Sequence, residues 1–449
     1  MKERVLPVSK NDDITLDITG INSEGQGVGH ISGYTVFVPG ALSGESVRAH
    51  VIKTGSSYAV AKLTDILVAS PDRVTPVCPA FPACGGCSLQ HLSYPAQLKL
   101  KTQIVQDAFK HIGKVEDICV RPIIGMNDPL HYRNKGSFPF SSLNDGSIAF
   151  GFFSPKSHRL IPLTDCPIQN PKIMSTVSAI RRWADSNRIT PYDETTRRGL
   201  LRHAVVRVSS QGEIMAVIVT AGKLPFQNSL ISSLPGVASI WHNINPDNTN
   251  VIFGKEFRLL RGKSVLYHDI NGYRYGISPQ SFLQINTPQT NRLYHTAIRL
   301  LNPQPEETVM DAYCGAGTIS LLLSSYCGNV IGIESVPEAI EDAVRNASLN
   351  SIHNVSFVCG KVEDLLPKYS SQISSIVLDP PRKGCDSAVL TCIGDSKIPK
   401  IVYISCNPAT LARDVSALSL LGYAVHDVQP VDMFPYTSHV ETVVRLSRQ

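Results

Sequence analysis

The stretch DAYCGAGT, residues 311–318, decides the fold class of this 449-residue chain. An apolar strand over residues 308–311 ends at Asp311, and Gly315-Ala316-Gly317 turns the chain into a helical segment. Glycines at such a turn let the backbone bend tightly and approach a ligand. The full G-x-G-x-x-G pattern and a P-loop lysine motif are both absent from the sequence. The stretch therefore predicts the opening of a nucleotide-type pocket.

Strands and helices alternate from about residue 266 to the end of the chain. The predicted strands are 308–311, 329–334, 354–358, 374–379, 400–405, 423–428 and 440–446. Such alternation predicts a doubly wound, Rossmann-like seven-stranded α/β sheet. About a dozen residues without a helix separate the last two strands, which predicts that this pair is antiparallel. That ending favours a methyltransferase-type sheet over a dehydrogenase.

Two carboxylates extend the predicted pocket at the ends of strands. Glu334 closes the second strand, where it would accept hydrogen bonds from ribose hydroxyls. Asp379 begins the turn Asp-Pro-Pro-Arg at the end of the fourth strand, at the edge where such sheets bind ligands. With Gly315 and Gly317 they indicate an S-adenosylmethionine pocket, and a plain strand-to-helix turn is the alternative. Arg382 replaces the base-stacking aromatic of amino-methylating enzymes, which argues against methylation of an exocyclic amine.

Two further segments supply a thiol and a base. Residues 405–408 read SCNP and residues 432–441 read DMFPYTSHVE, giving Cys406 and Glu441. A thiolate that attacks uracil C6 makes C5 nucleophilic, and a base must later remove the C5 proton. Asn407-Pro408 predicts the start of a helix over 409–420, whose N-terminus we expect to lower the pKa of the thiol. The alternatives are an inert buried thiol and a solvated carboxylate.

The rest of the chain predicts two further domains. Short alternating strands with glycine turns over residues 11–68 predict a small OB-like β-barrel, which is an RNA platform or a structural spacer. A helix over 96–112 and strands at 148–153, 203–208 and 214–220 predict a central α+β domain. We divide the chain into a barrel (1–70), a central domain (71–265) and a methyltransferase domain (266–449).

Four cysteines form a candidate metal site. Cys78, Cys84 and Cys87 come from one loop, and Cys166 is the natural fourth ligand. The Cys-Pro pairs at 78–79 and 166–167 are typical of iron–sulfur loops, and a four-cysteine zinc site is the alternative. Five further cysteines fall in ordinary element positions and are interpreted as structural: Cys119, Cys327, Cys359, Cys385 and Cys392.

Composition indicates an ordinary globular protein. Apolar residues make up 43% and charged residues 18% of the chain, and the net charge is +5. The first seven residues lack the apolar core of a signal peptide, and eleven cysteines fit a reducing compartment, so we expect a cytoplasmic protein. Residues 181–207 carry seven arginines, which indicates an RNA-phosphate surface or a solvated helix face.

These motifs together resemble the RNA uracil-C5 methyltransferase family, in its branch with an N-terminal TRAM barrel and an iron–sulfur cluster. The resemblance covers nearly the whole chain and is strongest at the cysteine set, at residues 278–286 (SPQSFLQIN), and at the DPPR, SCNP and DMFP…E motifs. Leu283 stands where relatives often have an aromatic residue, and Thr318 where some have asparagine.

The resemblance implies a role for each candidate residue. Cys406 would be the nucleophile and Glu441 the base. Gln284, Tyr313, Glu334 and Asp379 would line the S-adenosylmethionine pocket, and the four cysteines would hold a [4Fe-4S] cluster. The substrate implied is 23S ribosomal RNA, with tRNA as the alternative, and Arg133, Lys135 and the arginines of 181–207 would hold the RNA backbone.

Two other interpretations remain open from the sequence. A radical S-adenosylmethionine enzyme would need Cys-x3-Cys-x2-Cys, and the x5 spacing and fourth cysteine argue against it. A non-catalytic RNA-binding protein would not require a thiol and a base in register, although both are present.

Overall fold

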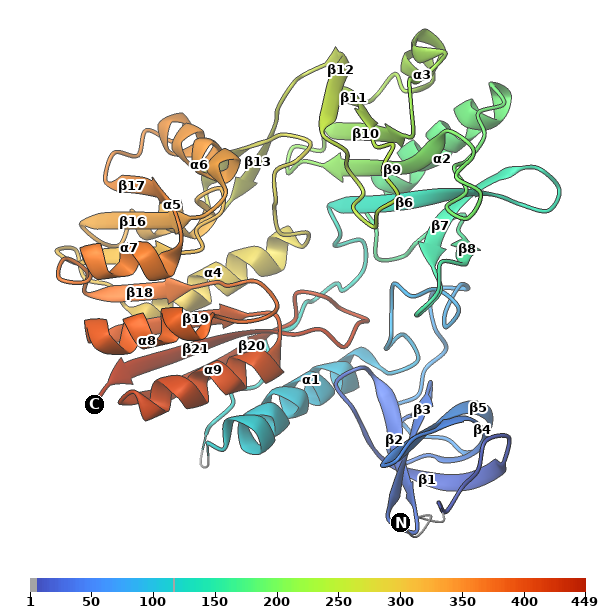
Figure 1. The fold of residues 1–449 in the computed structure, drawn as a ribbon, viewed down its shortest axis with the longest axis horizontal. Coiled ribbons are helices and arrows are strands. Elements are labelled where there is room, and N and C mark those ends of the chain that lie inside the picture. Colours follow the sequence, from blue (N-terminus) through green and yellow to red (C-terminus); the bar gives the residue numbers. More distant parts are fainter. Residues whose placement is uncertain (1–5, 116–117) are drawn as a thin grey trace.

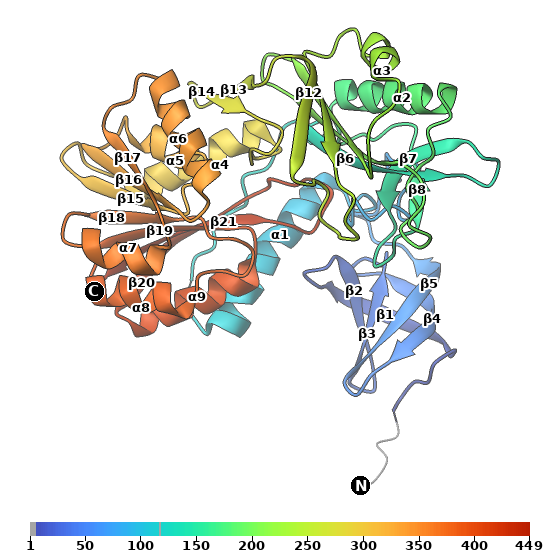
Figure 2. The ribbon, with the colours of Figure 1, turned by 45° about the horizontal axis from the view of Figure 1, so that its top comes forward.

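A computed structural model describes residues 6–115 and 118–449. The first five residues, on which the expected absence of a signal peptide partly rests, lie outside that range. Figures 1 and 2 show a blue barrel, a green central sheet and an orange-to-red sheet with helices on both faces. Within the described ranges, no helix has the length and apolarity needed to cross a membrane.

The N-terminal segment forms the predicted barrel. Its strands close in the order β1-β2-β3-β5-β4. Leu16 and Ile18 point into the barrel core, and the residue between them faces outward, as the period of two requires. The strands are β1 (Asp13–Ile21), β2 (Gln26–Ile31), β3 (Tyr34–Pro39), β4 (Ser46–Thr54) and β5 (Tyr58–Val68).

The central part is a seven-stranded sheet of order β12-β11-β10-β9-β6-β7-β8, covered by two helices. The predicted strands at 148–153 and 214–220 are present with these bounds, and 203–208 begins two residues earlier. The elements are β6 (Lys135–Ser142), β7 (Ile148–Phe153), β8 (Leu160–Pro162), α2 (Pro171–Ser186), β9 (Leu201–Val208), β10 (Ile214–Thr220), α3 (Gln227–Ser233), β11 (Ser239–Ile244) and β12 (Glu256–Gly262).

The C-terminal part is the predicted doubly wound sheet, entered through the hairpin β13 (Leu266–Ile270) and β14 (Tyr273–Ile277). Its seven strands lie in the order β17-β16-β15-β18-β19-β21-β20. The strands are β15 (Thr308–Ala312), β16 (Asn329–Glu334), β17 (Val355–Cys359), β18 (Ser375–Leu378), β19 (Lys400–Ser405), β20 (Tyr423–Val431) and β21 (Glu441–Arg448). The helices are α4 (Thr287–Leu301), α5 (Thr318–Leu323), α6 (Pro337–Leu349), α7 (Val362–Tyr369), α8 (Ser387–Ser396) and α9 (Pro408–Leu420).

Alternate residues of each strand bury against opposite faces of this sheet. On β15, Met310 joins the core under α7, α8 and α9, whereas Val309 joins the core under α4 and α5. The predicted helix near 96–112 is α1 (Tyr94–Ala108), which continues as a π-helical turn over Phe109–Gly113. Val105 and Phe109 of this segment lie in the same core as α9, so α1 packs on the methyltransferase sheet.

The last strand reverses the direction of the sheet. The first five strands are parallel, and β21 inserts antiparallel between β19 and β20. The predicted antiparallel pairing of the last two strands is therefore confirmed. Because β21 runs backwards, its first residue lies at the edge where the parallel strands end.

Candidate active site

Cys406 and Glu441 meet across the β19–β21 ladder. Ser405 pairs with Thr442 in the antiparallel register, so Cys406, which follows Ser405, lies opposite Glu441, which precedes Thr442, at the sheet edge. Glu441 is only 4% exposed, and Cys406 is half-buried. The structure thus brings together the thiol and the carboxylate that the sequence singled out.

The start of α9 fixes the position of Cys406. Asn407 caps the helix, its side chain accepting a hydrogen bond of 3.0 Å from the Ala409 amide, and Pro408 occupies the first turn. The Asn407 amide group also donates to the Arg382 carbonyl at 3.2 Å, as does the Thr410 hydroxyl at 3.3 Å. These two hydrogen bonds therefore hold the DPPR turn next to the segment that carries Cys406.

The pKa of Cys406 is raised, so the expectation that the helix end would lower it is wrong for the free protein. Burial is the largest cause, and the charges of Glu441 and Asp379 add to it. Arg382 acts in the opposite direction, lowering the pKa through its charge and a hydrogen bond to the thiol. The thiol therefore depends on Arg382, and on neutralisation of the carboxylates, to ionise.

Three buried carboxylates lie toward this edge of the sheet, and two of them, Glu441 and Asp379, act on the thiol. Burial and the charge of Asp379 raise the pKa of Glu441 to about 8, while Arg382 lowers it. Burial raises the pKa of Asp379 to about 7. Burial, with the charges of Asp379 and Glu334, also raises the pKa of Asp311 to about 7. Oδ1 of Asp311 is buried without a hydrogen-bond partner among the described residues. Such a cluster favours a cationic ligand.

The glycine turn leaves open space next to these carboxylates. Gly315 has a φ of +53°, and nothing lies within 4 Å of the position that a Cβ would occupy there. Gly317 has a φ of +81° and begins α5, where a Cβ would meet Phe357 at 3.0 Å. Glu334 accepts hydrogen bonds from the amides of Gly315 at 3.3 Å and Val336 at 3.0 Å. The turn and Glu334 therefore form one unit.

Tyr313 lies in the turn after β15, whereas Gln284 comes from the segment before α4. Tyr313 has a left-handed φ of +69°, which a non-glycine residue adopts only where the surrounding structure holds it. Burial raises its pKa, as does its contact with Cys385. Gln284 lies just before α4, and its carbonyl accepts a hydrogen bond of 3.0 Å from the side chain of Asn134. Phe282, two residues earlier, is 78% exposed.

The four candidate ligand cysteines line a single cavity, together with Phe81 and Gln90. Burial raises the pKa of Cys87 to about 12 and that of Cys166 to about 11, and the neighbouring thiols add to both shifts. Within residues 6–115 and 118–449, no set of three or more His, Cys, Asp or Glu side chains converges on one metal ion.

The arginine-rich segment divides between structural and exposed residues. Arg202 is buried and donates to the Asn245 carbonyl at 2.8 Å, and the buried Arg207 donates to the Ser281 carbonyl at 2.5 Å. Arg181 forms an ion pair with Asp185. In the backbone register, Lys135 of β6 lies opposite Arg207 of β9. Burial lowers the pKa of Lys135 to about 8. Four arginines of the segment are exposed: Arg182, Arg188, Arg197 and Arg198.

Sequence reasoning missed the roles of two residues at this site. Arg382 lies beside Cys406 and lowers the pKa of its thiol. The available signal was the place of Arg382 in the turn after Asp379, at the ligand-binding edge. Lys101 of α1 forms a fully buried ion pair with Asp432, at 2.5 Å, in the loop that leads to Glu441. No local signal joins two residues 331 positions apart.

The comparisons with known proteins agree with this architecture. The family model described as tRNA (Uracil-5-)-methyltransferase matches residues 261–449, and the TRAM domain model matches residues 8–64. An uncharacterized RNA methyltransferase of Halalkalibacterium halodurans is 45% identical, with 99% of each chain covered. Another, from Clostridium tetani, is 42% identical, with 98% of each chain covered.

A solved structure also matches along nearly the whole chain. It is the tRNA (uracil-54, C5)-methyltransferase of Pyrococcus abyssi in complex with S-adenosyl-L-homocysteine. The TM-score is 0.80 at 27% sequence identity, and the match covers 96% of this chain and 99% of that one.

The barrel, the doubly wound sheet and these matches define an RNA methyltransferase with a TRAM domain. More specifically, the chain belongs to the RNA uracil-C5 methyltransferase family, as the sequence motifs predicted.

The raised pKa of Glu441 predicts a pH-dependent stability difference. Folded Glu441 keeps its proton up to about pH 8, whereas the unfolded chain releases it near 4.5. Its burial therefore lowers the stability of the wild type progressively between these pH values and by a constant amount above them. Glu441→Gln should gain melting temperature over the wild type across this window, and the gain should then level off.

Thermal unfolding of the ligand-free protein from pH 4 to 9 measures this difference. Glu338→Gln, at an exposed position of α6, is the matched control and should show no such trend. If the difference in melting temperature between Glu441→Gln and the wild type did not change with pH, that result would contradict the assigned burial of Glu441.

Proposed function

We propose that this enzyme methylates C5 of uridine in RNA by covalent catalysis, with Cys406 as the nucleophile and Glu441 as the base. The facing positions of Cys406 and Glu441 across the β19–β21 ladder carry this proposal. A thiol and a carboxylate that both reach one uracil ring suit a reaction in which the thiol adds to C6 and the carboxylate removes the proton from C5.

Each residue has a defined step. The Cys406 thiolate forms a bond to C6 of the uracil, and the electrons of the C5–C6 double bond become available at C5. S-adenosylmethionine, when bound, supplies the methyl group that C5 takes. The Glu441 carboxylate then removes the C5 proton, the double bond re-forms, and the bond from C6 to sulfur breaks to return the thiolate.

Arg382 and the carboxylates set the ionisation of the two groups. Arg382 favours the thiolate of Cys406 and the carboxylate of Glu441, because its positive charge lowers both pKa values. A proton that leaves the thiol as the cycle begins returns to solvent through the half-exposed edge. Burial of Glu441 makes it a stronger base than a solvated carboxylate.

The pocket suits S-adenosylmethionine, which carries a positive sulfonium and a positive amine. Open space above Gly315 adjoins the buried carboxylates of Asp311 and Asp379, and Glu334 closes one side. Gln284, Tyr313 and Gly317 would complete the site. A cationic ligand would stabilise the ionised carboxylates, whose mutual repulsion is otherwise uncompensated.

The proposed substrate is 23S ribosomal RNA, because the barrel and the four-cysteine set together resemble enzymes that act on that RNA. tRNA is the second candidate, favoured by the match with an archaeal enzyme of tRNA uracil 54 over nearly the whole chain. In both cases the target base must leave its stack to reach Cys406. Arg133, Lys135 and the exposed arginines of 181–207 are proposed to contact the RNA backbone.

The four cysteines are proposed to hold a [4Fe-4S] cluster. The four thiols line one cavity, and four cysteine thiolates are the usual ligands of such a cluster, with a four-cysteine zinc site as the alternative. The cluster would have a structural role, because the cavity is lined by residues of the cysteine loop and the central domain and not by Cys406 or Glu441.

Methyl transfer to separate unmodified 23S rRNA and tRNA transcripts, followed by nucleoside mass spectrometry, tests the reaction and the substrate. We expect 5-methyluridine from the 23S transcript with the wild type and none with Cys406→Ala. Cys392→Ala, at a thiol on α8, is the matched control and should retain activity. Product from tRNA alone would favour the second candidate, and unchanged activity of Cys406→Ala would overturn the covalent mechanism.

The cofactor assignment predicts a selective loss of affinity. Glu334→Ala removes a carboxylate that would accept hydrogen bonds from ribose, so we expect S-adenosylhomocysteine to bind about tenfold or more weakly. Isothermal titration calorimetry measures the change. Glu338→Ala, four residues along at the exposed start of α6, should bind as the wild type does. Equal affinity of Glu334→Ala and the wild type would place the ribose elsewhere.

The cluster assignment predicts a loss of iron. Cys84→Ser should lower the iron and sulfide content of protein purified without air and remove its visible absorption. Cys392→Ser, on α8, is the control and should keep both. Zinc at one equivalent in the wild type, without sulfide, would instead support the alternative four-cysteine zinc site.

A further inference from the structure

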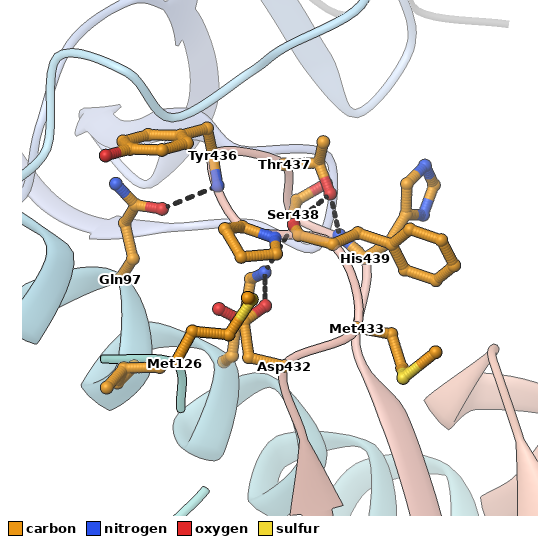
Figure 3. Close-up of polar contacts among 12 residues, drawn as sticks. Gln97, Met126, Asp432, Met433, Tyr436, Thr437, Ser438 and His439 are labelled. Carbon is orange, nitrogen blue, oxygen red and sulfur yellow. Dashed lines mark hydrogen bonds and ion pairs between the residues drawn. The ribbon is translucent and has the colours of Figure 1, made fainter. Parts of the chain in front are cut away.

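The loop of residues 432–440 joins β20 to β21 and leads directly into Glu441. Figure 3 shows this loop, here called the 432–440 loop, with Gln97 of α1 reaching the main chain of Tyr436. In Figures 1 and 2 the loop projects from the edge of the red sheet toward α1. The residues that hold the loop therefore bear on the position of the proposed base.

Helix α1 holds the beginning and the middle of the loop. Lys101 donates hydrogen bonds to the Asp432 carboxylate at 2.5 Å and to the Phe434 carbonyl at 2.9 Å. Lys101 and Asp432 are both fully buried, and the Tyr94 hydroxyl donates to the same carboxylate at 2.8 Å. The Gln97 side-chain oxygen accepts from the Tyr436 amide at 2.9 Å. A buried ion pair with these added hydrogen bonds defines one geometry for the loop.

The cysteine loop holds the far end of the 432–440 loop. The amides of Ser88 and Leu89 both donate to the Tyr436 carbonyl, at 3.0 and 2.9 Å, and the Ser438 amide donates to the Ser88 hydroxyl at 2.9 Å. Ser88 directly follows Cys87. Gln90, next in the chain after Leu89, lines the cysteine cavity, where its side chain donates to the Cys87 sulfur at 3.3 Å and accepts from the Cys78 amide at 3.0 Å.

The methyltransferase domain supplies the opposite side. The Asn286 side chain donates to the Met433 carbonyl at 3.0 Å, and that of Gln289 donates to the Asp432 carbonyl at 2.9 Å. Cys406, by contrast, is positioned by β19 and the cap of α9. The thiol and the base thus share the β19–β21 ladder, and only the base directly follows the 432–440 loop.

We propose that the segment Ser88–Lys101 positions Glu441 for proton removal by fixing the 432–440 loop. Its side chains do not touch the reacting atoms, so they are positioning residues. The proposal rests on the assignment of Glu441 as the base. Small displacements of a catalytic group cost large factors in rate. Loosening the loop should therefore slow release of the product from Cys406 and spare the attack of the thiol.

Gln97→Ala tests this by removing one loop contact from the cluster-loaded enzyme. With uridine RNA we expect roughly three- to tenfold slower turnover and accumulation of a methylated covalent enzyme–RNA complex, as expected for Glu441→Gln. With 5-fluorouridine RNA, which has no C5 proton to remove, the rate of covalent trapping should equal that of the wild type. Ser88→Ala should behave similarly and is the milder second variant.

Gln103→Ala is the matched control, because Gln103 lies on the exposed face of α1 and bonds Asp107. It should resemble the wild type in both assays. Hydrogen exchange of the RNA-free protein gives an independent readout. Amides of the 432–440 loop should exchange faster in Gln97→Ala and Ser88→Ala than in Gln103→Ala.

Equal slowing of trapping and turnover in both loop variants, or no change in either, would overturn the positioning role. Accumulation of the covalent complex with Glu441→Gln but not with the loop variants would overturn it while leaving the base assignment in place. Absence of the complex with Glu441→Gln would overturn the base assignment itself, and the positioning role with it.

Discussion

The reversed direction of β21 is the constraint on which the site depends. In a fully parallel sheet, the final strand would bring its last residues, not its first, to the ligand-binding edge. Because β21 runs antiparallel beside β19, the residue that begins it faces the residue that follows β19. The register of the ladder then places the backbone of Glu441 opposite that of Cys406.

The electrostatics of the edge follow from burial. Burial raises the pKa values of the carboxylates and of the Cys406 thiol, and the charges of Glu441 and Asp379 raise that of the thiol further, so the free protein favours the protonated thiol and the protonated Glu441. Arg382 offsets part of this effect. A cationic ligand in the adjoining space would offset more, which couples occupation of the pocket to activation of the thiol.

Much of the fold was predictable, since it depends on local patterns. The strand after residue 308, the glycine turn and the Asn-Pro helix start each follow from residues close together in the chain. The antiparallel ending followed from the short connection between the last two strands. The direction of the thiol's pKa shift did not follow, because it depends chiefly on burial in the folded protein, to which the charges of Glu441 and Asp379 on other strands add. The Lys101–Asp432 ion pair could not be predicted from the sequence either, because the two residues lie far apart along the chain.

The central claim is that Cys406 is the nucleophile and Glu441 is the base. Peptide mapping of the covalent complex tests this claim most directly. Glu441→Gln protein is incubated with uridine RNA and S-adenosylmethionine, digested with protease and nuclease, and analysed by tandem mass spectrometry. The account predicts a methylated uridine attached to the peptide that contains Cys406. Attachment to another cysteine, or a trapped uridine without the methyl group, would contradict it.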